Sequence, residues 1–129
     1  MHKAVLTILL AVVSGSSFAQ WFAVRGNAEA TIYINPTTVH MECNTAKMWH
    51  LVDFKTGQEL EHFGSYMSLR AESESDCEKK RLRFLDVTYY AKNMVRGAVV
   101  DSENEPDKWT PILPGSRAEV LWKVACWKL

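Results

Sequence analysis

A period-two alternation of apolar and polar side chains runs from Trp21 to about Val100 and leaves few folds open. The alternating runs are rich in Val, Ile, Thr, Tyr and Trp, the residues that fit a pleated, half-buried surface. This pattern predicts an antiparallel sheet with one apolar face. The expected strands are Trp21 to Val24, Ala30 to Ile34, Val39 to Glu42, Met48 to Phe54, Gly64 to Glu72, Arg81 to Tyr90 and Ala98 to Asp101.

Turn residues interrupt the alternation about every ten positions and separate these strands. Gly, Asn and Pro each tolerate or impose turn geometry. The expected breaks are Arg25-Gly26-Asn27, Asn35-Pro36, Cys43-Asn44, Thr56-Gly57 and Glu103-Asn104-Glu105-Pro106. No internal repeat occurs, and no linker is long enough to divide the chain into two domains.

The apolar period changes near the C-terminus. Ser116 stands three residues before Glu119, the capping-box spacing in which each side chain accepts from the other residue's backbone N–H. Four apolar residues then fall on one helical stripe: Ala118, Leu121, Trp122 and Ala125. A final strand is the alternative, because Val120, Trp122 and Val124 alternate, but the cap favours a helix. The expected fold is therefore α+β: a single antiparallel sheet of about six to seven strands, with a C-terminal helix packed on one face.

The first nineteen residues read as a secretory signal peptide. Lys3 leads into the apolar run from Ala4 to Val13, and Ser17 and Ala19 occupy the small-residue positions before the cleavage site. The run is shorter than the ~20 residues that a membrane span requires. We therefore expect a signal peptide over 1–19, a single domain over 20–129, and export to an oxidising compartment.

The charge balance gives no electrostatic reason to expect two classes of partner. The chain has 15 basic and 15 acidic side chains, is 47% hydrophobic and 23% charged, and is typical of a globular domain. Removal of residues 1–19 takes away Lys3 and leaves 14 basic and 15 acidic side chains among 110 residues. Neither nucleic acid nor an anionic membrane is an expected partner, because both attract an excess of Lys and Arg.

Three cysteines remain after that cleavage, namely Cys43, Cys77 and Cys126. An odd number leaves one thiol over, and three pairings are open. A bridge between Cys77 and Cys126 would stabilise the fold by on the order of 4 kcal/mol in the chain-entropy model. Cys43 lies near a predicted hairpin turn, where its thiol is either exposed, and so able to link two chains or to react, or buried and inert.

Enzymatic motifs are absent from the sequence. It contains no glycine-rich phosphate loop and no nucleophile elbow. The best metal candidates are His40, Cys43 and His50, since a three-residue turn would place His40 opposite His50 on the next strand. No fourth ligand is evident, and polar residues on a solvated strand face are the favoured interpretation. We therefore predict a protein that is not an enzyme, with no catalytic, cofactor or metal site.

A basic ridge is the sharpest charge feature. In a strand that starts near Lys79, the side chains of Lys79, Arg81 and Arg83 project from one face and could recognise an acidic protein segment or a sulfated polysaccharide. The alternative is a solvated outer face with carboxylate neighbours. Trp109, in a proline-rich loop, either packs beneath that loop or is exposed for a partner, whereas Trp49 and Trp122 are expected in the core.

The segment from Trp49 to Cys126 resembles the surface-adhesin protein E family of Gram-negative bacteria. The resemblance is carried, in order, by Trp49 to Asp53, Ser65 and Ser68, Asp76-Cys77, Arg81 and Arg83, Tyr89-Tyr90, Gly97 to Val100, Trp109, Pro114-Gly115-Ser116 and Cys126. It implies an antiparallel sheet of about six strands with a C-terminal helix. It also implies that a disulfide between Cys77 and Cys126 ties this helix to the sheet.

The resemblance also implies a function. The family's named member is similar to a non-catalytic adhesin that binds host matrix proteins such as vitronectin and laminin and can form a homodimer. Gln20 stands where that lipoprotein has its lipid-anchored cysteine, and Cys43 has no family counterpart. We expect an exported binding domain, periplasmic or secreted, with Lys79, Arg81, Arg83 and Trp109 as its candidate contact residues. The alternative is a periplasmic, envelope-associated structural protein with no host ligand.

Overall fold

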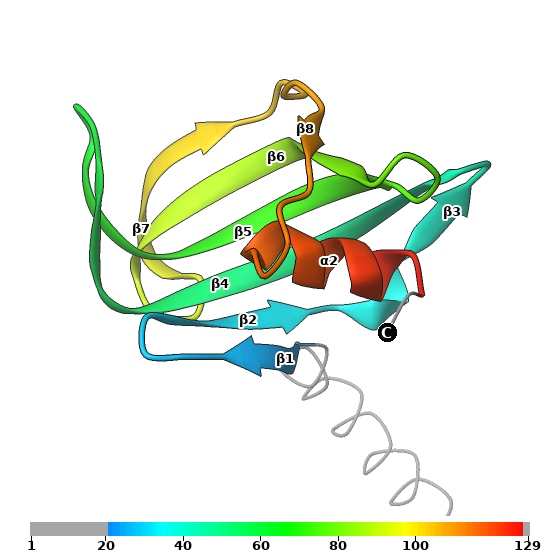
Figure 1. The fold of residues 1–129 in the computed structure, drawn as a ribbon. Helices are drawn as coiled ribbons and strands as arrows, with labels where there is room; N and C mark the ends of the chain where they lie inside the picture. The colour runs from blue at the N-terminus through cyan, green and yellow to red at the C-terminus, as the bar shows by residue number, and fades with distance from the viewer. Residues whose placement is uncertain (1–20, 128–129) are drawn as a thin grey trace, which may run out of the picture.

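The computed structural model describes residues 21–127, which form an eight-stranded antiparallel sheet with one helix lying across it (Figure 1). The elements are β1 (Phe22–Gly26), β2 (Ala30–Ile34), η2 (Pro36–Thr38), β3 (His40–Glu42), β4 (Thr45–Leu60), β5 (Gly64–Asp76), β6 (Arg81–Lys92), β7 (Arg96–Glu103), β8 (Thr110–Pro111) and α2 (Arg117–Ala125). The strand order is β1-β2-β4-β5-β6-β7, with β3 paired to β4 and β8 paired to β6. The predicted signal peptide lies outside the described residues.

The α+β class, the antiparallel sheet and the C-terminal helix are confirmed, but the sheet has eight strands rather than six to seven. The strand that the alternation missed is β8, where Thr110 pairs with Leu82 and Pro111 with Arg81. Two residues are too few to show a period, and a proline within a run argues against a strand. The local sequence therefore does not predict the pairing of β8 to β6.

The longest hairpin joins β4 to β5, and the turn predicted at Thr56-Gly57 is wrong. The chain passes through this position in extended form and turns at residues 61–63 instead. Asp53 pairs with Ser68 and Gln58 with Tyr66, so four β4 residues stand between these pairs opposite one β5 residue. The backbone N–H of Lys55 donates to the carbonyl of Glu29 at 2.9 Å, which keeps this stretch beside the β1–β2 turn.

Helix α2 begins at the predicted cap. The hydroxyl of Ser116 accepts from the Glu119 N–H at 3.2 Å. The reciprocal bond is displaced by one residue, because the Glu119 carboxylate accepts from Gly115 N–H at 3.0 Å while Ser116 N–H donates to the Leu113 carbonyl. Gly115 has a φ of +77°, a conformation that glycine adopts without a steric penalty.

The core lies between α2 and the sheet. Three residues of the predicted helical stripe, Leu121, Trp122 and Ala125, are buried there, and Ala118 packs against them. The sheet contributes Ile32, Ile34, Ala46, Met48 and Leu82, and Ile112 adds to them from beyond β8. Burial of a large apolar side chain such as Leu121 contributes roughly 1.5–3 kcal/mol, so this stripe is the main attachment of the helix.

A disulfide fixes the end of α2 to the end of β5. Cys77 and Cys126 are bonded, with their Cα atoms 5.5 Å apart and a sequence separation of 49 residues. The indole N–H of Trp122 also donates to the carbonyl of Asp76 at 2.7 Å, in the buried layer beside the bridge. The pairing implied by the family resemblance is confirmed. Cys43 is a free, exposed cysteine in the turn between β3 and β4.

The sheet has a second face, opposite α2, which we call the open face. Ala46, Met48 and His50 of β4 point to the helix side, so the alternate residues Lys47 and Trp49 lie on the open face. The cross-strand pairs extend this assignment to β5 and β6. The open face carries Arg70, Glu72, Glu74 and Asp76 on β5, and Arg81, Arg83, Asp86 and Thr88 on β6. Within residues 21–127, no helix has the length and apolar character to cross a bilayer.

Candidate functional site

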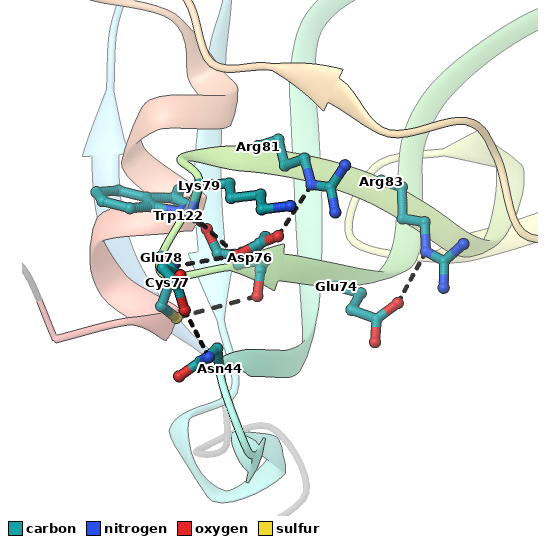
Figure 2. A network of polar contacts seen from close by, with 10 residues as sticks. Asn44, Glu74, Asp76, Cys77, Glu78, Lys79, Arg81, Arg83 and Trp122 are labelled. Atoms are coloured by element: carbon teal, nitrogen blue, oxygen red, sulfur yellow. Dashed lines mark hydrogen bonds and ion pairs between the residues drawn. The ribbon is translucent and has the colours of Figure 1, made fainter.

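The predicted basic residues Arg81 and Arg83 lie side by side on the open face of β6. Each faces an acid on β5, since Arg81 pairs with Asp76 and Arg83 with Glu74. The Nε–H of Arg81 donates to Asp76 at 2.9 Å, and the Nε–H of Arg83 donates to Glu74 at 2.8 Å (Figure 2). The two carboxylates are 9% and 11% exposed and the two arginines 36% and 30%, so these ion pairs are partly buried.

Trp109 covers this pair of arginines. The guanidinium carbon of Arg81 lies 4.6 Å from the centre of the indole ring, and that of Arg83 lies 4.5 Å from it. Pairing of Pro111 with Arg81 brings the loop before β8 to this position. Trp109 is thus half-buried, in contact with the two arginines. We call the five residues Glu74, Asp76, Arg81, Arg83 and Trp109 the Arg81–Trp109 cluster.

The turn that connects β5 to β6 organises one side of the cluster. The carboxylate of Asp76 accepts from the backbone N–H groups of Glu78 at 3.1 Å and Lys79 at 3.0 Å. The Lys79 bond is the largest cause of a lowered pKa of Asp76, and the bonds from Arg81 and Glu78 lower it further against the opposing effect of burial. Asp76 is therefore held ionised beside Arg81.

Lys79 does not belong to the predicted ridge. Strand β6 begins at Arg81, and Lys79 is an exposed residue of the preceding turn. The reason is that Lys80 has a φ of +50°, which breaks the extended backbone between Lys79 and Arg81. The structure therefore brings together Arg81, Arg83 and Trp109. The fourth predicted contact residue, Lys79, stays in the neighbouring turn.

The β3–β4 turn is attached to the same corner of the molecule. The side-chain amide of Asn44 donates to Glu78 at 2.6 Å, and its backbone carbonyl accepts from the Cys77 N–H at 2.8 Å (Figure 2). Cys43 precedes Asn44 in this turn with a φ of +56°. The β3–β4 turn and the β5–β6 turn therefore meet beside the disulfide.

The predicted histidine pairing is wrong. The β3–β4 turn has two residues, Cys43 and Asn44, so His40 lies opposite Lys47 rather than His50. His50 is 1% exposed on the helix side, and burial, with a smaller effect of the Arg117 charge, lowers its pKa to about 3. Among residues 21–127 no group of three His, Cys, Asp or Glu side chains is placed to hold a metal ion.

Trp49 is a second tryptophan that the structure places differently from the prediction. It lies half-buried on the open face rather than in the core beneath α2. Its ring is 5.2 Å from the guanidinium carbon of Arg70, a residue that the sequence pattern did not single out. Alternation with the buried residues Met48 and His50 was the available signal for this placement.

Both the sequence and the fold of the chain are similar to those of known proteins. The family model described as surface-adhesin protein E matches residues 21–127. Crystal form II of Haemophilus influenzae protein E is similar with a TM-score of 0.63 at 12% identity, over 85% of this chain and 89% of that chain. Another structure of the protein gives 0.61 at 11% identity, over 85% and 86% of the two chains.

Protein E from non-typeable Haemophilus influenzae is also similar, with a TM-score of 0.59 at 11% identity over 84% of this chain and 76% of that chain. At such identities the likeness shows a shared fold. No curated protein matches the chain. The family model, in contrast, spans nearly all the described residues, from the first strand to the end of α2. The chain therefore belongs to the surface-adhesin protein E family.

Proposed function

We propose that the chain is an exported, non-catalytic binding domain that contacts a protein partner through the Arg81–Trp109 cluster. The partner we favour is an acidic segment of a host matrix protein of the vitronectin or laminin type. Membership of a surface-adhesin family supports this class of function. The observation that carries the proposal is the stacking of two guanidinium groups, 4.6 and 4.5 Å from one indole ring.

The geometry of the cluster suits recognition of carboxylate or sulfate groups. Each arginine uses its Nε–H for an internal carboxylate, which fixes the orientation of its planar guanidinium group. The terminal N–H donors of an arginine form a fork that matches an oxyanion in two-point contact. Because the ring and the ion pairs already hold both side chains, a partner would lose little side-chain entropy on binding them.

A binding assay with the mature chain, residues 20–129, tests the proposal. Immobilised vitronectin and laminin should bind the protein at micromolar concentration, and Trp109→Leu should weaken this binding at least tenfold. Arg83→Lys, which keeps the charge but not the fork, should weaken it several-fold. Arg96→Gln, an exposed arginine at the start of β7, is the matched control and should bind like the unmodified protein. Binding that is unchanged by Trp109→Leu would rule out this cluster as the contact.

The second candidate is an envelope-associated structural protein of the periplasm with no host ligand. The internal ion pairs favour it, because Asp76 and Glu74 neutralise the charges of Arg81 and Arg83 and weaken their long-range attraction for an acidic partner. Cell fractionation distinguishes the two candidates. Digestion of the protein by protease added to intact cells supports the adhesin, whereas release only with the periplasmic contents supports the structural protein.

A further inference from the structure

A second arginine and tryptophan group lines a hollow elsewhere on the open face. The hollow has a volume of about 380 Å³ and is lined by Trp21, Asn35, Thr38, Trp49 and Arg70. These residues come from the chain before β1, from the β2–η2 connection, from the end of η2, and from β4 and β5. The volume lies within the ~300–1,000 Å³ typical of small-molecule sites.

Backbone hydrogen bonds hold the walls of this hollow in place. The Asn35 N–H donates to the Trp49 carbonyl at 3.2 Å, and the Trp49 N–H donates to the Thr38 hydroxyl at 3.0 Å. Phe22 pairs with Ile34 across the β1–β2 hairpin, which puts Trp21 next to Asn35. Trp21, just before β1, and Trp49, in β4, therefore lie on the two sides of β2, which pairs with both strands.

Arg70 differs from Arg81 and Arg83 on the open face, because it forms no ion pair with any of the described residues. Among residues 21–127 its side chain forms no hydrogen bond or ion pair, and the Nε–H is buried without an acceptor. Its guanidinium carbon lies over the face of Trp49, 5.2 Å from the ring centre. A buried donor without a partner destabilises the fold, and an acceptor supplied by a ligand would recover part of that cost.

We propose that this hollow, the Arg70 hollow, binds a carboxylate carried on a ring. The carboxylate would accept from the guanidinium group of Arg70, for which a planar two-oxygen anion is the matching shape. The ring would lie against the indole of Trp49 or Trp21, whose flat apolar faces favour stacked contact. Two sources supply this chemistry, an acidic sugar such as a uronic acid and an aromatic carboxylate.

Titration with small probes tests the site directly. Methyl β-D-glucuronide and benzoate are added separately to the isotope-labelled chain 20–129, while the indole N–H resonances are followed by NMR. The neutral counterparts are methyl β-D-glucoside and benzamide. We expect saturable shifts of the Trp49 and Trp21 signals at millimolar concentration with at least one acid. The neutral counterparts should bind at least tenfold more weakly, because they have no carboxylate for Arg70.

Variants separate the Arg70 hollow from the Arg81–Trp109 cluster. Arg70→Gln and Arg70→Lys should each weaken binding of the acid at least tenfold, the second because an ammonium lacks the fork. Arg25→Gln, at an exposed arginine of β1, and Trp109→Leu should leave it unchanged. Near-ultraviolet circular dichroism establishes that each variant keeps its tertiary structure. Trp109→Leu also distinguishes the two proposals, since it should weaken binding to matrix proteins alone.

Each outcome has a defined meaning. Binding of the glucuronide alone, or of benzoate alone, supports the site and identifies the source of its ligand. Equal binding of an acid and its neutral counterpart would overturn the proposal, and so would full binding by folded Arg70→Gln. The absence of saturable shifts at Trp49 and Trp21 with both acids would also overturn it.

Discussion

The open face holds two groups in which arginine stacks on tryptophan, and they differ in what surrounds the guanidinium. In the Arg81–Trp109 cluster each arginine also binds a nearly buried carboxylate at 2.8–2.9 Å. In the Arg70 hollow the guanidinium meets the Trp49 ring alone. The Nε–H groups of Arg81 and Arg83 are thus bonded within the fold, whereas the Nε–H of Arg70 has no acceptor among the described residues.

Cross-strand register causes this difference. Arg81 and Arg83 lie opposite Asp76 and Glu74, whereas Arg70 lies opposite Leu51 on one side and Thr88 on the other. An uncharged neighbour on each side gives Arg70 no acid in the direct cross-strand position, where opposite charges interact most strongly. The comparison teaches that the neighbour across the strand decides whether the Nε–H of an arginine on tryptophan is bonded within the fold.

The largest expected effect comes from removing the disulfide bond, which begins at the residue after Asp76 of the Arg81–Trp109 cluster. Replacing Cys77 and Cys126 by Ala should lower the free energy of unfolding by about 4 kcal/mol, because the 49-residue separation is no longer closed in the unfolded chain. Urea denaturation followed by tryptophan fluorescence measures this loss. Cys43→Ser, at the exposed free cysteine, is the control and should change stability by less than about 0.5 kcal/mol.

The second prediction compares the arginines directly. Arg83→Met should cost about 2 kcal/mol, because the Glu74 side chain is 11% exposed and, among residues 21–127, Arg83 alone bonds to its carboxylate. Arg70→Met should cost less than about 1 kcal/mol, since it leaves no charge unpaired. Denaturation midpoints of the two variants, measured side by side, provide the test. Equal losses would show that the carboxylates do not distinguish the two groups.

The third prediction isolates the stacking contacts. Double-mutant cycles that combine Trp109→Leu with Arg83→Met, and Trp49→Leu with Arg70→Met, should each give a coupling energy of about 0.5–1 kcal/mol. Similar couplings in the two groups would sharpen the comparison by assigning the difference to the ion pairs. A coupling near zero at Trp109 would mean that the indole covers Arg83 without stabilising it.

The smallest expected effect is a change in how the free energy of unfolding depends on pH under acidic conditions. The pKa of Asp76 is lowered in the fold, so its contribution is complete above the ordinary carboxyl pKa of about 3.9 and is lost as pH falls through the lower folded value. Asp76→Asn should flatten the slope of unfolding free energy against pH below about pH 4. Arg70→Met should retain that slope. Stability measured at several acidic pH values checks both, and an unchanged slope in Asp76→Asn would contradict the assignment.

Much of the fold could be predicted because its signals are local. The alternation located the seven longer strands, and the Ser116 cap located the helix against a competing strand pattern. Long-range pairing was the part that local patterns could not supply. The Lys55 bond to Glu29 carries β4 past the Thr56-Gly57 signal, and Pro111 pairs with β6 although its own sequence argues against a strand.

The candidate site was predictable in composition but not in geometry. Alternation along β6 correctly placed Arg81 and Arg83 on one face, but nothing local showed that the loop before β8 folds Trp109 over them. Arg70 was missed for the opposite reason. A single arginine in a strand shows no pattern of its own, and its significance depends on Trp49, Leu51 and Thr88, which belong to two other strands.

The β4–β5 hairpin turns at residues 61–63, beyond the predicted position, and the place of this turn has a practical consequence. Beyond the irregularity after Asp53, the strands continue as a pair to an exposed turn that ends in Phe63, itself 57% exposed. Extra residues at such a turn add little loop-closure entropy and disturb no core contact. An epitope tag inserted between Glu61 and His62 should leave the fold intact, and it would report the orientation of the domain on whole cells without touching either tryptophan group.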